Sequence, residues 1–250
     1  MIPKHLTIVS RRVIKQLILD KRYLALSTVA PLIIIGFYKL FADAITSSTP
    51  GFVIARYAVP ISAFIVHFLC FILCAIALVQ ERKDGTLERL FINGVNRSSI
   101  IGGYALGYFG LATVQSVIVI AETIWLFDLN FTSGEIMLIF IVIWLLAIVS
   151  VLLGIFVSTF ARSEGHVFPF IPLLILPSIF LSGLLIDVSL LPNPVQFFSH
   201  LLPLNYANNI LQDIVFDDLN LTETIQNISI LFGYALFLWI LASSTLKETE

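Results

Sequence analysis

Three side chains able to bind a metal or a proton stand together in one apolar stretch of the sequence. They are His67, Cys70 and Cys74, and their spacing places them on one face of a helix. Imidazole and thiol groups at this spacing can bind copper or zinc. One helix rarely supplies a full set of ligands and no second cluster occurs, so we expect no metal site. A packed cysteine pair beside a hydrogen-bonded histidine is the simpler interpretation, and a pore-facing His67 is the alternative.

Three more polar side chains lie inside apolar stretches, namely Lys39, Gln115 and Glu122. An ionised group in hydrocarbon costs about 3 kcal/mol, so each is a candidate for function. Gln115 and Glu122 are seven residues apart and share a helix face. Lys39 and Glu122 fall at similar depth, which favours an ion pair between their helices. The alternatives are a pair of Lys39 with Asp43 on the same helix, or a Lys39 that extends toward the headgroups.

A charged segment, ERKDGTLERL at 81–90, directly follows the stretch that contains the cysteines. Gly85 interrupts the chain, and Thr86 can cap a short helix over 87–91 that ends near residues 93–94. A short charged helix held rigidly at a membrane surface can bind a soluble partner. The alternative is a solvated loop whose charges only fix the topology.

The composition requires a membrane environment. The chain is 58% hydrophobic and 12% charged, with a mean hydropathy of +1.00, whereas a soluble domain carries about 25% charged residues. The net charge of −2 gives no indication of a nucleic-acid partner. The only two cysteines are Cys70 and Cys74, which is not a disulfide framework.

Six apolar stretches are long enough to cross a bilayer as helices, which takes about 20 residues each. They cover approximately 23–44, 57–79, 100–127, 135–160, 167–186 and 225–246. The runs are continuous rather than alternating, so helices are predicted and barrel strands are not. We therefore predict an all-α integral membrane protein with one transmembrane domain over 1–250. In the third span Gly103, Gly107 and Gly110 share a face, which predicts close packing against a neighbour.

The positive charges predict which side each end occupies. Twelve of the fourteen lysines and arginines fall on one side of the six spans, which places both termini in the cytoplasm (N-in, C-in). The twelve are Lys4, Arg11, Arg12, Lys15, Lys21, Arg22, Arg82, Lys83, Arg89, Arg97, Arg162 and Lys247. Only Lys39 and Arg56 fall toward the other side, whose loops are acidic. A multi-pass protein of the cytoplasmic membrane is the expected result.

Two segments outside the spans have a pattern of their own. Residues 5–20 place apolar and basic side chains on different sides of a helix, typical of an amphipathic helix in the inner interface; a plain extension of the first span is the alternative. The outer stretch 187–224 is apolar over 190–204, too short to span and broken by prolines. We predict short re-entrant helices there, packed against protein.

The segment ERKDGTLERL resembles the E-R-E-x-G-T-L-E-x-L signature of type-2 ATP-binding-cassette transporter permeases, where it follows the second span and forms the coupling helix that meets the ATPase. Residues 180–183 (FLSG), 191–192 (LP) and 202–207 (LPLNYA) resemble the family's fifth span, outer re-entrant helices and NPLTYA-like stretch, with Leu202 where many members have Asn. The resemblance covers the whole chain and is nearest to the drug- and lipid-exporting branch.

The resemblance implies an ATP-driven exporter of a hydrophobic or amphiphilic molecule, with two permease chains, expected to be a homodimer, in membrane lipid. Two copies of a cytosolic ATPase would hold ATP and magnesium, and this chain would bind no cofactor. The implied coupling residues are Glu81, Arg82, Gly85, Thr86, Leu87, Glu88 and Arg89. The candidate pore or substrate residues are His67, Gln115, Glu122 and Lys39.

The sequence itself indicates that nucleotide is bound elsewhere. A P-loop needs a lysine followed by Ser or Thr, and no lysine here is followed by either. The chain is therefore not expected to be an enzyme. Export of a lipid-linked polysaccharide is the alternative within transport. A membrane-embedded enzyme is a weaker alternative, because its catalytic groups must converge while the four histidines lie far apart in the sequence. A purely structural membrane subunit is a third class.

Overall fold

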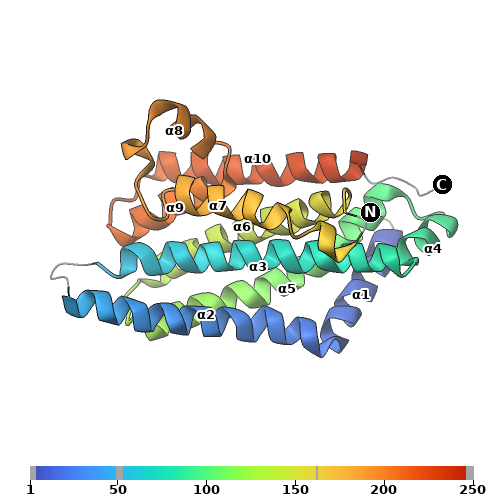
Figure 1. The fold of residues 1–250 in the computed structure, drawn as a ribbon, viewed down its shortest axis with the longest axis horizontal. Coiled ribbons are helices and arrows are strands. Elements are labelled where there is room, and N and C mark those ends of the chain that lie inside the picture. The colour runs from blue at the N-terminus through green and yellow to red at the C-terminus, as the bar shows by residue number, and fades with distance from the viewer. Residues whose placement is uncertain (1–3, 49–52, 162, 246–250) are drawn as a thin grey trace.

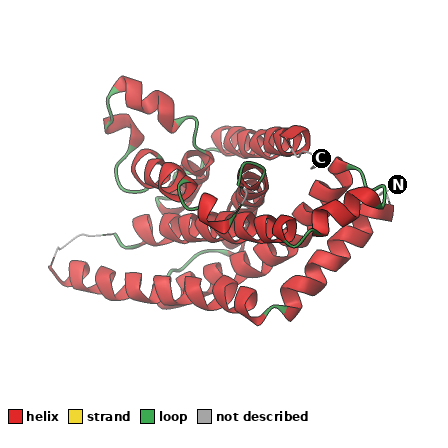
Figure 2. Ribbon diagram, turned by 45° about the vertical axis from the view of Figure 1, so that its right-hand side comes forward, coloured by secondary structure: helices red, strands yellow, loops and turns green. Residues whose placement is uncertain are grey.

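A computed structural model describes residues 4–48, 53–161 and 163–245. The described chain consists of helices joined by short loops, without a strand (Figures 1 and 2). The α-helices are α1 (Lys4–Leu19), α2 (Lys21–Ser48), α3 (Ala55–Lys83), α4 (Thr86–Ile92), α5 (Arg97–Leu126), α6 (Ser133–Ser158), α7 (Phe170–Leu181), α8 (Asn193–Ser199), α9 (Pro203–Val215) and α10 (Leu221–Thr245). Two 3-10 turns, η1 (Glu164–His166) and η2 (Val188–Leu190), complete the order.

Six segments are long and apolar enough to cross a membrane: α2, α3, α5, α6, the stretch Glu164–Leu181 that contains α7, and α10. Five of them match the predicted spans within a few residues. The fifth differs, because the predicted helix over 167–186 is regular only from Phe170 to Leu181. Pro169 stands at its N-cap, and the chain turns at Gly183, whose φ is +79°. A positive φ is open to glycine and ends the helix there.

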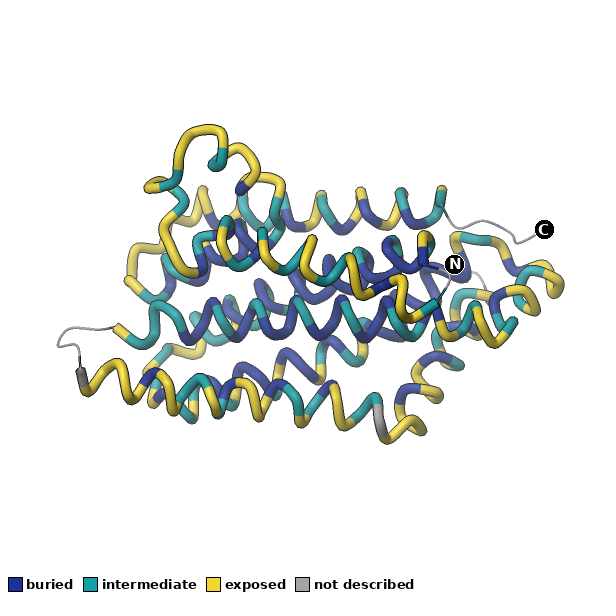
Figure 3. The backbone as a smooth tube through the Cα atoms, in the orientation of Figure 1, coloured by how far each residue is buried: buried dark blue, intermediate teal, exposed yellow. Residues whose placement is uncertain are grey.

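The bundle is built around α3 and α6, the two helices with the largest buried share (Figure 3). Gly154 of α6 permits their closest approach. A Cβ added to it would lie 2.6 Å from the carbonyl oxygen of Phe71 in α3. By contrast, α2 and the stretch that contains α7 have the smallest buried shares of the six.

Helix α1 crosses one end of the bundle and bends into α2 near Asp20 (Figure 1). Its buried face carries Val9 and Val13, which pack against the glycines of α5. A Cβ added to Gly103 would lie 2.5 Å from Val9 Cβ, and one added to Gly107 would lie 2.5 Å from Val13 Cγ1. The predicted close packing is thus confirmed at these two glycines. It is wrong for Gly110, where an added Cβ meets nothing within 4 Å.

The segment after α7 forms two short helices of different character. Helix α9 packs against α3, α6 and α10 and buries Leu204, Ile210 and Leu211. Helix α8 stands away from the bundle and leaves Phe197 and Phe198 exposed (Figure 1). Both segments are helical; α8 contacts chiefly α7 and the adjoining 3-10 turn, whereas α9 packs into the bundle.

The start of α1, helix α4 and the end of α10 all lie at the same end of the bundle (Figure 1). Below, this is called the α4 end. An even number of spans returns the chain to the side where it began, in agreement with this placement. Arg162 and Lys247, which contribute to the charge asymmetry, lie outside the described residues.

Candidate coupling loop and buried polar layer

The charged segment after α3 folds as a sharp turn followed by a two-turn helix. Gly85 adopts φ +69° between α3 and α4, and Gly94 adopts φ +73° after α4. The predicted helix over 87–91 is therefore present but longer, from Thr86 to Ile92. Thr86 is its first helical residue rather than its cap, and no side chain caps its N-terminus. At its other end the C-cap residue Asn93 donates Nδ2 to the Arg89 carbonyl oxygen at 2.6 Å. A left-handed glycine at each end explains why the helix stops and starts so abruptly.

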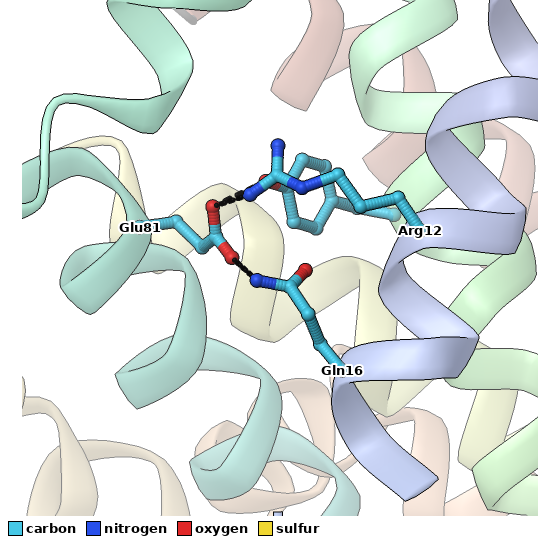
Figure 4. A network of polar contacts seen from close by, with 4 residues as sticks. Arg12, Gln16 and Glu81 are labelled. Carbon is cyan, nitrogen blue, oxygen red and sulfur yellow. Dashed lines mark hydrogen bonds and ion pairs between the residues drawn. The ribbon is translucent and has the colours of Figure 1, made fainter. Parts of the chain in front are cut away.

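The first acidic residue of the segment, Glu81, is directed into the protein and binds three donors. Its Oε2 accepts hydrogen bonds from Arg12 Nη2 at 2.8 Å and from Tyr104 OH at 3.0 Å. Its Oε1 accepts one from Gln16 Nε2 at 2.7 Å (Figure 4). The Glu81 side chain is 14% exposed and that of Arg12 is 33% exposed. Glu81 thus ties α1 and α5 to the base of α3 through charge-assisted bonds.

The neighbouring Arg82 binds the opposite side of the bundle. Its Nη1 donates to the carbonyl oxygens of Thr159 and Ala161, both at 3.3 Å. These carbonyls follow the end of α6, where helix oxygens lack intrahelical partners and carry partial negative charge. Glu81 and Arg82 together hold the entry to α4 at two points.

The tip of the loop points the other way. Leu87 is buried and anchors α4 on the bundle, whereas Glu88, Arg89 and Ile92 are exposed. The Ile92 residue is 84% exposed, which is unusual for a large apolar residue on a helix fixed at its base. Sequence reasoning missed Ile92; its spacing of four from Glu88 places both on one helix face and would have indicated it.

In the middle of the membrane, polar side chains of α3 bind the helices beside it. His67 Nδ1 lies 2.6 Å from Ser150 Oγ. That hydroxyl donates to the Leu146 carbonyl oxygen at 2.6 Å, so it accepts from the imidazole N–H. Cys70 Sγ donates to Gln115 Oε1 at 3.4 Å. His67 is therefore packed beside α6, as in the simpler interpretation, and its serine is not placed as an activated nucleophile.

Three polar groups of α5, those of Gln115, Ser116 and Glu122, keep unused hydrogen-bonding capacity. Gln115 Nε2 and Glu122 Oε2 are buried, and neither has a partner within the described ranges. An unsatisfied buried polar atom costs about 1–3 kcal/mol. Such groups call for a role other than packing.

The predicted ion pair between Lys39 and Glu122 does not form in the described structure. Lys39 Nζ lies 2.7 Å from Asp43 Oδ1, one turn along α2, and 5.4 Å from the centre of the Phe127 ring. This is the same-helix alternative. The four candidate pore residues, His67, Gln115, Glu122 and Lys39, thus occupy three helices and do not converge on one cavity in the single chain.

At the far end of the bundle, α9 binds the turn that follows α7. Asn208 Nδ2 donates to the Ser182 carbonyl oxygen at 2.9 Å, and Gln212 Nε2 donates to the Gly183 carbonyl oxygen at 2.9 Å. These bonds join the FLSG segment to the helix that begins with LPLNYA. The two amides were not predicted, although their spacing of four residues could have indicated a shared face.

A family model described as ABC-2 type transporter matches residues 4–216, which include the charged segment at 81–90 and all of α9. The chain belongs to the ABC-2 type transporter family. With its six apolar helices, this ABC-2 chain is a multi-pass membrane protein. The family is one of transporter permeases, as the resemblance implied.

This ABC-2 chain is similar in sequence to three curated relatives. It is 30% identical over 70% of its length to ABC transporter G family member 20 of Dictyostelium discoideum, of which it covers 24%. It is 25% identical over 63% of its length to linearmycin resistance permease protein LnrN of Bacillus subtilis, of which it covers 40%. It is 25% identical over 60% to the probable multidrug ABC transporter permease YbhR of Escherichia coli, again covering 40%. The chain spans less than half the length of each.

Proposed function

We propose that this chain is the membrane-spanning subunit of an ATP-driven exporter, and that α4 is the helix through which a separate cytosolic ATPase moves the spans. The observation that carries the proposal is the two-sided loop. Glu81 and Arg82 fix its base to α1, α5 and α6, while Glu88, Arg89 and Ile92 face outward. When a partner displaces α4, this displacement is transmitted to α1, α5 and α6 together, because the base of the loop is bonded to all three. ATP and magnesium are assigned to two ATPase copies.

The exported molecule is proposed to be hydrophobic or amphiphilic. The surfaces of the described spans are largely apolar, and two relatives carry names that refer to multidrug transport and linearmycin resistance. Export of a lipid-linked polysaccharide is the alternative, and it predicts no response of the ATPase to small amphiphiles.

We place a second copy of the chain against α2 and α7. These are the two least buried spans, and both contact α3. Their exposed apolar residues include Phe37 on α2 and Leu173 on α7. A pore between two copies would bring such faces together, which also explains why the candidate pore residues do not converge in one chain.

The coupling role is tested with a matched pair of exposed apolar residues. Ile92 is 84% exposed on α4, and Leu221 is 77% exposed at the opposite end of the bundle. Co-expressed with a cytosolic ABC ATPase that co-purifies with the wild-type chain, the Ile92→Asp variant is expected to lose at least tenfold of ATPase co-purification and amphiphile-stimulated hydrolysis. Leu221→Asp should lose neither. Equal behaviour of the two variants rejects α4 as the docking helix.

A backbone variant tests the same loop. Gly85→Pro imposes φ near −65° where the chain has +69°. Stimulated hydrolysis should vanish while membrane insertion persists. Intact assembly and stimulation in this variant, or in Glu88→Ala, would contradict the coupling assignment.

The N-in, C-in orientation has its own test. The only native cysteines are Cys70 and Cys74, and both are buried. In intact cells, a membrane-impermeant maleimide should label Leu221→Cys and spare Ile92→Cys, and opening the cells should reverse that protection. Labelling of Ile92→Cys in intact cells would invert the topology.

Glu122 is proposed to contact cationic substrates, because its Oε2 has no partner in the described chain. Glu122→Gln should lower export of cationic amphiphiles relative to neutral ones. Unchanged export of every cationic substrate removes this role and leaves the coupling proposal standing.

A further inference from the structure

A cavity of about 250 Å³ opens between α1, α2 and α5, beside the bend that joins α1 to α2. Its lining is almost wholly apolar and includes Ile14 and Ile18 of α1, Leu24 of α2 and Val114 of α5. Gly110 borders this space, and a Cβ added there meets nothing within 4 Å. A dry cavity of about 150 Å³ holds benzene. This one has room for a longer piece of hydrocarbon.

Two cations, Arg11 and Lys15, stand on the basic side of α1 at its edge with Ile14 and Ile18, which line this cavity. Arg11 precedes Ile14 by three residues and Ile18 by seven, and Lys15 follows Arg11 by four. Residues at these spacings lie one above another on a helix. Arg11 and Lys15 are exposed, and neither forms an ion pair with another residue in the described ranges. The apolar cavity therefore has positive charge beside it, at the end of the bundle.

Apolar volume next to exposed cations matches one kind of molecule found in every bilayer. We propose that the cavity binds one anionic phospholipid, with an acyl chain between α1, α2 and α5 and the phosphate against Arg11 and Lys15. Helices that mix basic and apolar side chains bind anionic lipid surfaces, and each basic residue strengthens binding about fivefold. Gln115, a candidate substrate residue, lines the same cavity, and lipid retention is measured without transport, so the two roles are tested separately.

The position of the cavity gives the lipid a structural consequence. Arg12, next to Arg11 on α1, binds Glu81 at the base of the coupling loop. A lipid seated in the cavity packs against the helix that holds this loop. The occupied cavity thus fixes α1, and with it the entry to α4.

Native mass spectrometry of the full chain in detergent measures the site directly. The probes are dioleoyl phosphatidylglycerol and dioleoyl phosphatidylcholine in equal amounts, which share their acyl chains and differ in charge. The wild type should retain about one phosphatidylglycerol per chain in preference to phosphatidylcholine. The double variant Arg11→Gln/Lys15→Gln should lose about 30-fold of that preference, whereas Lys83→Gln/Arg89→Gln, equal in charge and at the same end, should keep it. Equal retention of the two lipids by the wild type overturns the proposal.

The acyl-chain part is tested with two equal substitutions. Gly110→Leu fills the cavity, and Gly233→Leu adds the same side chain on α10, where an added Cβ also meets nothing within 4 Å. Gly110→Leu should abolish retention of phosphatidylglycerol and Gly233→Leu should not. The milder Gly110→Ala, expected to weaken retention, replaces Gly110→Leu if that variant does not fold. If the Gly110 variant retains as much phosphatidylglycerol as Gly233→Leu, the lipid binds elsewhere and the proposed site is wrong.

Discussion

Glu81 at the α4 end of the bundle and two side chains of α5 within the membrane differ in how fully they are hydrogen-bonded. At the α4 end, both carboxylate oxygens of Glu81 accept hydrogen bonds, from three donors on α1 and α5. In the membrane, Gln115 and Glu122 each leave a buried polar atom without a partner in the described chain. Saturated groups fix positions, because moving them breaks strong bonds. Unsaturated groups retain the capacity to bind something that arrives later.

The largest effect is expected from breaking the saturated cluster. Glu81→Ala leaves Arg12 and Tyr104 without their acceptor. The loss of stability should be about 3 kcal/mol, the lower end for a buried ion pair because Arg12 is one third exposed. Thermal unfolding in detergent measures it, with exposed Lys83→Ala as a control expected to change stability by less than about 0.5 kcal/mol.

A double-mutant cycle separates this cluster from general packing. If Arg12 and Glu81 act as a pair, then Arg12→Ala and Glu81→Ala together should cost less than the sum of the two, by about 1–3 kcal/mol. Strict additivity would mean that the 2.8 Å contact contributes nothing to the fold.

The next effect comes from the seam between α1 and α5, which positions the cluster. Gly103→Ala places a Cβ 2.5 Å from Val9 Cβ, so α1 must shift. Overpacking of this kind costs about 1–3 kcal/mol. Gly110→Ala, on the same helix, is expected to stabilise by up to about 1 kcal/mol, since it meets open space and favours the helix. Equal melting temperatures for the two variants would show that α1 is not held at this seam.

The two glycines also show where sequence reasoning succeeds and where it fails. Spacing alone put Gly103, Gly107 and Gly110 on one face, and the continuous apolar runs gave five spans within a few residues. Spacing could not reveal that α1 crosses only the first two glycines and leaves an opening at the third. That depends on the angle at which α1 meets α5, which no local pattern encodes.

The structure of the charged segment at 81–90 was predictable in outline, but its contacts were not. Gly85 and the charges of 81–90 indicated a turn and a short helix. The partners of Glu81 lie 69 and 65 residues away on α1 and 23 residues away on the next span. The sequence therefore could not show that Glu81 faces inward and Ile92 outward. The prediction that Lys39 pairs with Glu122 was wrong for a different reason. Asp43, one turn away on the same helix, is reached more readily than a group on another helix.

A smaller and opposite effect is expected from the membrane layer. Gln115→Leu removes an unpaired buried amide nitrogen and only a weak thiol bond at 3.4 Å. Stability should rise by up to about 1 kcal/mol, while export of amphiphiles falls if the amide contacts substrate. His67→Leu, which breaks a 2.6 Å bond, should instead lower stability by about 1 kcal/mol. Loss of stability in Gln115→Leu would mean that its carboxamide is satisfied in the native protein.

The smallest effect concerns two carboxyl groups that line one hollow at the far end of the bundle, Asp187 and Asp213. Burial, with the charges of Glu223 and Asp218, raises the pKa of Asp213. Hydrogen bonding to Ser189 lowers the pKa of Asp187. A raised carboxyl pKa means that stability is lost as the pH rises through the folded value. A lowered one means that stability is present at neutral pH and lost as the pH falls through the folded value.

The two isosteric variants should therefore respond to pH with opposite signs. At pH 7.5, Asp213→Asn should melt at a higher temperature than the wild type and Asp187→Asn at a lower one. Each change in the free energy of unfolding should be less than about 1 kcal/mol, because solvent screens both groups. Both differences should shrink toward pH 4, where the unfolded-state carboxyl is about half protonated. Shifts of the same sign would show that net charge, rather than the separate surroundings of these carboxyls, sets stability in this hollow. The hydrogen bonding of each individual carboxyl group would then matter for stability at Glu81 but not in this hollow.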